Sequence, residues 1–140
     1  MKIKLRHVKN FDWDFILKLR NSKKNRLQMY STTIITKKEH YDYMTKQLLN
    51  PHFIHRIICY DKKDVGYIRI LENDVSIFLD EKYHGKGIGT KALKLIEKIA
   101  KNSNITKLIA RIRIENIQSL KIFNKNDYQL KMYWFEKDLK

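Results

Sequence analysis

Glycine is rare in this chain, yet three of its four glycines fall within residues 83–89, which read Tyr-His-Gly-Lys-Gly-Ile-Gly. An apolar run precedes this stretch, and a helical pattern begins directly after it. Glycine is used where the backbone needs a positive φ or must approach another group closely. A loop of this kind at the start of a helix directs free N–H groups and the positive end of the helix dipole toward an anion. The stretch therefore predicts a phosphate-bearing ligand held by main-chain groups.

Two common phosphate-binding patterns do not fit this loop. The Walker A pattern needs Lys followed by Ser or Thr after its last glycine, whereas Gly89 is followed by Thr90 and Lys91 in the reverse order. The dinucleotide-binding pattern has a different glycine spacing and an early place in the chain. The loop alone thus indicates an anion but no particular ligand.

The elements that must position this loop can be predicted from hydrophobic periodicity. Thr36 and Glu39 have the capping-box spacing, so a helix is expected to begin there and to end before Asn50-Pro51, and Asn10 is a candidate cap for an earlier helix. Strands are expected over 3–8, 53–60, 65–71, 74–79 and 108–114, helices over 12–21, from Thr36, over 90–101 and around 117–123, and one or two further strands over 128–139. This order predicts an α/β (mixed α+β) fold in a single domain, residues 1–140, built on one sheet.

Composition limits the classes of protein to which the chain can belong. A hydrophobic fraction of 43% in 140 residues is typical of one folded domain with its own core. The single cysteine, Cys59, excludes a disulfide framework, and its apolar neighbours favour a buried structural thiol; no metal site is expected. The chain opens with alternating charged and apolar residues, not with a signal peptide, and no apolar run is long enough to span a bilayer. A cytoplasmic protein without a membrane partner is expected.

The formal net charge of +15 admits two interpretations. A basic domain can bind nucleic acid through phosphate neutralisation, or lysines can solvate the surface and steer a small anionic ligand. The lysines are spread along the whole chain and form no concentrated basic arm. This distribution favours the second interpretation, with no nucleic-acid partner, and leaves open whether the protein is a monomer or a homodimer.

The chain resembles the GCN5-related N-acetyltransferase (GNAT) family at two motifs. The family's acetyl-CoA loop, Arg/Gln-x-x-Gly-x-Gly/Ala, has its counterpart in residues 84–89, and the later signature Asn-x-x-Ala/Ser-x-x-x-Tyr/Phe has its counterpart in Asn116, Ser119 and Phe123, followed by Tyr128. The resemblance implies a mostly antiparallel central sheet with splayed fourth and fifth strands, helices on both faces, and acetyl-CoA as co-substrate. It assigns these residues to the cofactor site: Phe78, Leu79, His84, Gly85, Lys86, Gly87, Ile88, Gly89, Thr90, Asn116, Ser119 and Phe123.

The chain departs from the family pattern at three positions. His84 replaces the usual Arg or Gln, and Asp127 replaces a glycine. Phe123 stands where many members carry a tyrosine proposed as general acid toward the departing thiolate. Asn116 can equally be a helix N-cap, and the spacing of Phe123 from its apolar neighbours favours core packing.

The chemistry that the resemblance implies is direct attack of an amine on the thioester, which requires a base to remove a proton from the amine. The candidate residues on the strands before the loop are Glu72, Asp74 and, through water, Ser76, while Glu115 and His84 are further alternatives. Tyr133 is a candidate substitute for the missing acid.

The acceptor is expected to be a small-molecule amine. Three short pieces resemble nucleotide-sugar N-acetyltransferases of the pseudaminic-acid pathway, and they assign Arg20, Asn21, Met29, Tyr30 and His40 to the acceptor pocket. Arg20 and Asn21 can equally end a helix, and His40 can be a surface residue. A protein N-terminal acetyltransferase resembling the ribosomal-protein enzymes and a non-catalytic acetyl-CoA-binding module are the alternatives.

Overall fold

Four antiparallel strands form the sheet that organises the computed structural model, in which residues 2–139 are described. The strands lie in the order β1-β2-β3-β4, so that each pairs with the next along the chain. Their bounds are Ile3–His7 for β1, Phe53–Tyr60 for β2, Lys63–Leu71 for β3 and Asp74–Leu79 for β4. The alternation of apolar and polar residues predicted all four strands, because one side chain in two must face each covering layer.

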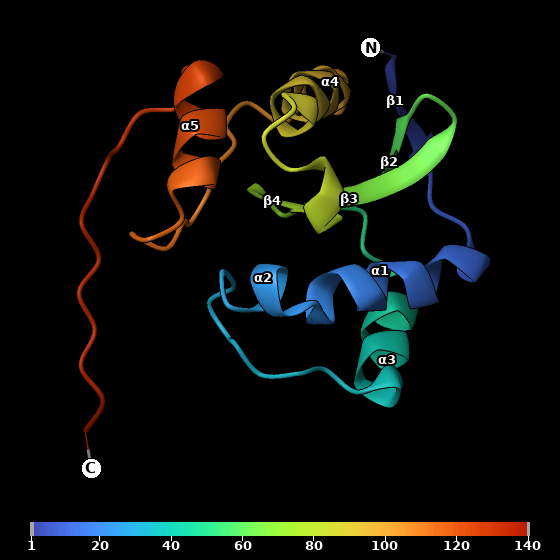
Figure 1. Ribbon diagram of the computed structural model, residues 1–140, viewed down its shortest axis with the longest axis horizontal. Helices are drawn as coiled ribbons and strands as arrows, with labels where there is room; N and C mark the ends of the chain where they lie inside the picture. The colour runs from blue at the N-terminus through green and yellow to red at the C-terminus, as the bar shows by residue number, and fades with distance from the viewer. Residues whose placement is uncertain (1, 140) are drawn as a thin grey trace.

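Helices cover both faces of this sheet (Figure 1). The helices α1 and α3 lie on one face, and α4 and α5 lie on the other. The helical segments are η1 Asn10–Asp12, α1 Trp13–Asn21, α2 Lys23–Arg26, α3 Lys37–Gln47, η2 Glu81–Tyr83, α4 Ile88–Asn102 and α5 Ile117–Lys125. The predicted mixed α/β fold with helices on both faces is confirmed.

Each face of the sheet has its own core. Under α4, Ile68 and Ile70 of β3 pack in one cluster with Ile96, and all three are fully buried. On the opposite face, Tyr67 and Phe78 stack with ring planes 10° apart beneath the layer of α1 and α3. Because consecutive strand residues point to opposite faces, β3 and β4 contribute to both cores.

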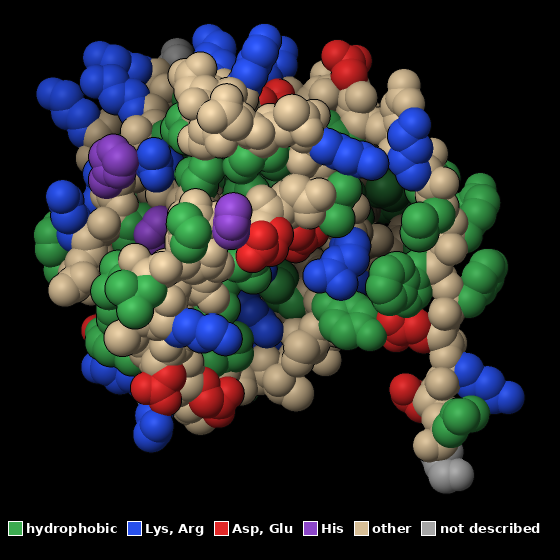
Figure 2. Space-filling view, turned by 180° about the vertical axis from the view of Figure 1, so that it is seen from behind, with side chains coloured by type: hydrophobic (Ala, Val, Ile, Leu, Met, Phe, Trp, Pro, Cys, Tyr) green, Lys and Arg blue, Asp and Glu red, His purple; other side chains and the backbone are tan. Residues whose placement is uncertain are grey.

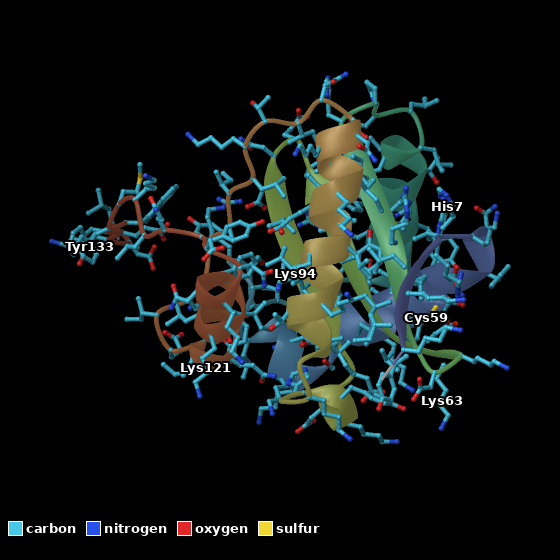
Figure 3. All side chains as sticks on the ribbon, turned by 90° about the horizontal axis from the view of Figure 1, so that it is seen from above. His7, Cys59, Lys63, Lys94, Lys121 and Tyr133 are labelled. Atoms are coloured by element: carbon cyan, nitrogen blue, oxygen red, sulfur yellow. The ribbon has the colours of Figure 1, made fainter. Side chains whose placement is uncertain are left out.

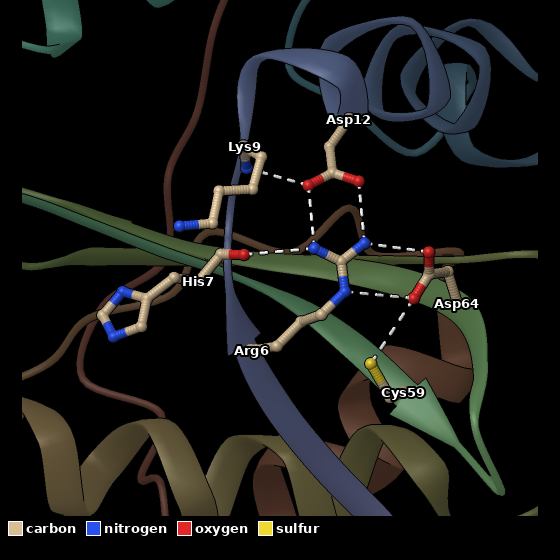
Figure 4. A network of polar contacts seen from close by, with 6 residues as sticks. All are labelled: Arg6, His7, Lys9, Asp12, Cys59 and Asp64. Atoms are coloured by element: carbon tan, nitrogen blue, oxygen red, sulfur yellow. Dashed lines mark hydrogen bonds and ion pairs between the residues drawn. The ribbon is translucent and has the colours of Figure 1, made fainter.

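A polar clamp ties the first strand to the rest of the sheet (Figure 4). The Arg6 guanidinium contacts the Asp12 carboxylate at 2.7 Å and the Asp64 carboxylate at 2.8 Å. Asp12 also accepts the Lys9 N–H at 2.8 Å, so it organises the start of the helical region. The prediction that Asn10 caps the first helix is therefore wrong, because Asn10 lies inside η1.

Cys59 lies beside this clamp and is only half-buried, with its thiol 3.5 Å from an Asp64 oxygen. Cys59 packs against the margin of the core on the face of α1 and α3, so the predicted burial of this structural thiol is only partial. Cys59 also points to the face of the sheet opposite to Ile58, toward the polar clamp.

The predicted fifth strand is reduced to a single bridge. Asp74 and Ile109 form an isolated parallel pair, in which Ile109 donates to the Asn73 carbonyl and accepts from the Val75 N–H. Beyond Ile109 the segment leaves β4, and the Arg113 guanidinium is bonded instead to the Met29 carbonyl at 2.8 Å. The prediction of a full strand over 108–114 is wrong for this reason, although the splayed arrangement itself is present.

The predicted terminal strands over 128–139 are also absent. The segment is extended and runs past α5 without pairing with a strand, and hydrophobic side chains lie along it (Figures 1 and 2). Its contact with the body includes Glu136, which accepts a hydrogen bond from the Tyr30 hydroxyl at 2.7 Å. Its last backbone hydrogen bond among the described residues is from the Tyr128 N–H to the Phe123 carbonyl. An alternating pattern favours extended backbone, but a strand also needs a neighbour, and the segment has none here.

Among residues 2–139, no helix has the length and apolar character that crossing a membrane would require.

Candidate active site

The splaying of the chain after Ile109 opens a cleft along one edge of β4. Backbone groups alternate in direction along an antiparallel strand, and the Val75 N–H points toward Ile109, away from β3. The N–H and C=O groups of Ile77 and Leu79 therefore point into the cleft as well. A free strand edge of this kind can pair with an extended ligand that carries amide groups.

The cleft has three walls besides this edge. They come from α2 and the residues after it, from residues 110–112, and from α5. The space between these walls is about 840 Å³ when the open solvent at the mouth is included. Its lining includes Lys24, Asn25, Gln28, Met29, Ser76, Phe78, Leu79, His84, Arg111, Asn116, Ser119 and Phe123.

The glycine loop leads into the N-terminus of α4 just after His84, which lines the cleft. Gly85 and Gly87 have φ of +74° and +79°, and a Cβ on either would meet no protein atom within 4 Å. Gly87 is the N-cap, no side chain caps the helix, and its first turn carries no acidic residue. Gly85 and Gly87 thus allow a left-handed backbone conformation and leave open space beside the uncapped N–H groups of α4. An anion can bind in such a space.

The third glycine of the loop serves packing. A Cβ on Gly89 would lie 2.7 Å from the Cδ1 atom of Ile122, so α4 approaches α5 closely at this point. Ile88 is fully buried in the core, so only its backbone is available to a ligand. Lys86 is exposed and Thr90 is half-buried at the same helix start.

The carbonyl of Leu79 already has two side-chain partners. It accepts from Asn25 Nδ2 at 3.0 Å and lies 3.2 Å from His84 Nε2. Asn25 also donates to the Leu19 carbonyl, so it links α1, α2 and the end of β4. The sequence analysis missed Asn25, because it lies in a segment without clear periodicity and pairs with a residue 54 positions away.

The three residues of the later motif lie together on the far wall of the cleft. Asn116 accepts the Ser119 N–H and caps α5, so its helix-capping role is confirmed. The Phe123 ring is buried and meets Tyr128 edge to face, with 4.9 Å between the ring centroids. The predicted packing role of Phe123 is confirmed, and its ring also borders the cleft.

Among the predicted bases, Asp74 has the most unusual surroundings. Its carboxylate lies 3.9 Å from the Arg111 guanidinium, and burial raises its pKa although Arg111 and Arg69 oppose that shift. Ser76 follows on the same face of β4 and lines the cleft. Glu72 is exposed in the turn between β3 and β4 at φ of +60°.

Tyr133 is not among the residues that line the cleft. It is 79% exposed on the terminal segment, which projects from the body of the molecule (Figure 3).

The predicted acceptor residues divide into two groups. Met29 lines the cleft, and Tyr30 is exposed with its ring 5.8 Å from the Arg111 guanidinium. His40 is buried, with Nε2 2.8 Å from the Trp13 carbonyl, and burial lowers its pKa. Asn21 bonds both the N–H and the C=O of Ile35.

Arg20 belongs to the second group, because it is buried and donates to the Ser31 carbonyl at 3.0 Å. Arg20 and Asn21 therefore hold the segment between α2 and α3 in place, whereas His40 ties α3 to α1. None of the three lines the cleft. Arg69 and Arg111, which flank Asp74, had no signal in the sequence because strand register and a distant segment bring them together.

Comparison with known proteins identifies the fold and its relatives. The model of the acetyltransferase (GNAT) family matches residues 15–128. A protein of Bacillus subtilis (strain 168), YwnH, provisionally named a phosphinothricin acetyltransferase, is 42% identical over 55 residues. That alignment spans 39% of this chain and only 34% of the relative's length.

Solved structures agree in fold. A domain from Methanocaldococcus jannaschii DSM 2661 matches with a TM-score of 0.80 and 23% identity, covering 91% of this chain and 88% of the other. A protein from Salmonella typhimurium, solved with its cofactor acetyl-CoA, matches with a TM-score of 0.76 and 15% identity over 93% of this chain and 81% of its own. At these identities the likeness concerns the fold.

Proposed function

This chain belongs to the GNAT family of acetyltransferases, and on that premise we propose that it uses acetyl-CoA in the cleft beside β4 to acetylate a primary amine. The observation that carries the proposal is the free edge of β4, which runs through the cleft toward the glycine loop and the uncapped start of α4. An extended arm with amide groups fits the edge, and a pyrophosphate fits the N–H groups at the helix start.

The residues present suit this co-substrate in both parts. Gly85, Gly87 and the backbone of residues 88–90 would hold the phosphates, and the C=O of Ile77 with the N–H of Leu79 would hold the arm. When bound, acetyl-CoA supplies an acyl group on a good thiol leaving group. Asn116, Ser119 and Phe123 would line the opposite side of the arm.

Asp74 is the candidate base in this proposal. Its side chain shares a face of β4 with Ser76. Asp74 itself pairs with Ile109, at the point beyond which the two segments separate. An ionised carboxylate at that place would take the proton that the attacking amine must lose, directly or through water. The edge N–H of Ile77 is a candidate donor to the oxygen on which negative charge develops.

For the acceptor, a nucleotide-linked amino sugar is the candidate from the sequence resemblance. Met29 at the cleft and Tyr30 next to Arg111 support an acceptor approaching from the segment between α2 and α3. The partial likeness to YwnH adds amino acids of the phosphinothricin type as a second candidate.

The test is a CoA-release assay with three acceptor groups, namely nucleotide-linked amino sugars, amino acids and N-terminal peptides. Acetyl-CoA binding is measured in parallel by calorimetry. Release with one small-molecule group supports the proposal, whereas release with peptides alone would favour the protein-acetylating alternative. Binding of acetyl-CoA without release from any group would favour a binding module.

A backbone variant sharpens this test. Ile77→Pro removes one N–H that faces the cleft, and proline is tolerated at a strand position whose N–H is outside the ladder. Ile77→Val keeps that N–H and serves as the matched control. We expect Ile77→Pro to lose turnover and Ile77→Val to retain it, with both folded by circular dichroism.

A further inference from the structure

Three arginines gather beneath the segment that joins α2 to α3. Arg20 donates to the Ser31 carbonyl at 3.0 Å, and Arg26 donates to the Thr32 carbonyl at 2.9 Å. Arg69 reaches the same region from β3, and the charges of Arg26 and Arg69, together with burial, lower the pKa of Arg20. Neutral carbonyls satisfy hydrogen bonds but do not neutralise charge, so the cluster retains a positive excess.

Several buried polar atoms around this cluster have no hydrogen-bond partner among the described residues. They are Nε of Arg26, Nη1 of Arg69, Oε1 of Gln28 and Oδ1 of Asp74. An unsatisfied buried polar atom costs about 1–3 kcal/mol, and more when it is charged. Four such atoms in one region point to a ligand that supplies the missing partners.

Strand register places these groups at a defined spacing. Arg69 lies directly across from Ser76, and Asp74 is two residues from Ser76 on the same face. Arg69 and Asp74 are thus diagonal neighbours, with Cα atoms on the order of 7–8 Å apart. On its other side, Asp74 faces Arg111 at 3.9 Å. The Asp74 carboxylate therefore lies between the guanidinium groups of Arg69 and Arg111, and both favour its ionised form.

From this arrangement we infer that the acceptor amine carries an anionic group a short distance away, which binds Arg69 and Arg26 while the amine lies at Asp74. The inference rests on the proposed function and adds the chemical class of the acceptor. A carboxylate, phosphinate or phosphate would fill the open guanidinium positions with charge-assisted hydrogen bonds. Polycationic amines would be repelled by the same groups.

Two kinds of acceptor offer this chemistry. In an amino acid the carboxylate is next to the amine, and in a nucleotide-linked amino sugar the phosphate lies across one sugar ring from it. The two kinds differ in the distance between the amine and the anion. The shared feature is the anion, so the experiment must compare charged and uncharged forms of each kind.

The test measures kcat/KM by CoA release for matched acceptor pairs. Glutamate is compared with its diamide, in which both carboxylates are replaced by neutral amides, and a UDP-linked 4-amino sugar is compared with the free amino sugar. We expect the wild-type protein to prefer the charged member of at least one pair by about 10-fold or more, since a desolvated charged contact contributes more than 1.4 kcal/mol. The pair that shows the preference identifies the source of the anion.

Variants assign the preference to the cluster. Arg69→Gln should abolish it mainly by raising KM for the charged acceptor, and Arg69→Lys should restore part of it as a point charge without the fork geometry. Arg56→Gln is the matched control, because Arg56 lies in the same sheet on the opposite face. If Arg69 only supports the fold, Arg69→Gln should lower the melting temperature. If Arg69 is instead held against the repulsion of the neighbouring arginines, Arg69→Gln should leave the melting temperature equal or raise it.

The outcomes separate this inference from the function on which it rests. Equal kcat/KM for charged and uncharged acceptors, unaffected by Arg69→Gln, would overturn the anion site and leave the acetyltransferase proposal intact. Absence of release with every amine would overturn the proposed function itself. Loss of the preference in Arg56→Gln as well as Arg69→Gln would also count against the site, because the effect would then follow from general charge.

Discussion

Asp74 holds a carboxylate in surroundings that disfavour its charge, beside two guanidinium groups that favour it. Burial outweighs the guanidinium groups and raises the pKa of Asp74. A base must be ionised to act, so kcat/KM should fall as the pH drops through this raised pKa, at a higher pH than for an ordinary aspartate near 3.9. Asp74→Asn should lower kcat by roughly 10²-fold and remove that limb of the pH profile.

Stability should respond to the same substitution in the opposite direction. Because the pKa of Asp74 is higher in the folded than in the unfolded state, folded protein binds the proton more tightly, and stability falls as the pH rises through that window. At neutral pH Asp74→Asn should therefore unfold at an equal or higher temperature in calorimetry. Asp42→Asn, on the exposed face of α3, is the control for both measurements. Unchanged kcat in Asp74→Asn would remove Asp74 from the mechanism.

Single residues of the site differed in how far sequence could predict them. The glycine loop, Asn116 and Ser119 follow one another in short motifs, so local spacing predicts their position. Arg69 reaches Asp74 only through the pairing of β3 with β4, and Asn25 reaches Leu79 across 54 residues. Such contacts depend on tertiary packing, which no local pattern encodes.

At the scale of elements, the start of α4 is the part that the proposed function needs most. Gly87→Ala places a methyl group in open space beside the uncapped N–H groups, at a φ that costs alanine about 1–2 kcal/mol. We expect a lower melting temperature and a 10-fold or greater rise in the Kd for acetyl-CoA by calorimetry.

The control for Gly87→Ala lies at the other end of the same helix. Asn104 has φ of +64°, so Asn104→Ala introduces a similar backbone strain away from the loop. It should lower the melting temperature without changing the Kd. If Gly87→Ala also left the Kd unchanged, the backbone cradle for phosphate would be rejected.

The clamp that joins β1 to η1 and to the β2–β3 hairpin offers a separate test of fold stability. Burial opposes ionisation of Asp12, but hydrogen bonds from Arg6 and the Lys9 N–H outweigh it and lower its pKa. The ionised Asp12 carboxylate therefore contributes to the free energy of unfolding above about pH 4, and this contribution is lost as the pH falls through the lowered pKa. Asp12→Asn should reduce the free energy of unfolding in urea by about 1–3 kcal/mol at pH 7.

Asp64→Asn is the matched comparison for that clamp. Asp64 bonds the same guanidinium but is 42% exposed, compared with 4% for Asp12. Its loss should cost less than about 1 kcal/mol, since water screens an exposed pair. Equal losses for the two variants would contradict the assignment of the clamp's strength to burial.

Periodicity predicted elements well where their partners are close in the chain. The strands β2, β3 and β4 are joined by tight turns, so the pattern and the pairing coincide. Segments 108–114 and 128–139 show a similar alternation, but their expected pairing depends on distant contacts. Arg113 draws the first segment toward Met29, and the second then lacks a paired neighbour.

At the scale of the whole molecule, charge and apolar surface are unevenly distributed. The whole chain has a formal net charge of +15. Residues 128–139, in contrast, include two lysines, one glutamate and one aspartate, so the net charge of this segment is zero. The large apolar residues of that segment are exposed by 63–92%, namely Leu130, Met132, Tyr133, Trp134, Phe135 and Leu139. Several large apolar side chains exposed on one segment are typical of an association site, and the segment itself adds no net charge to the repulsion between two copies.

We therefore expect the full chain to associate in a concentration-dependent manner, with the terminal segment as the contact. Light scattering coupled to size-exclusion chromatography should show a mass above that of one chain, and a chain ending at Tyr128 should elute as a monomer. Trp134→Ser combined with Phe135→Ser should weaken association in the full-length chain, whereas Lys131→Ser should not. A monomeric full-length chain at every concentration would mean that the apolar segment contacts its own body or a different partner. Because the segment lies outside the cleft, acetyl-CoA binding by the shortened chain should be unchanged, which separates assembly from the site.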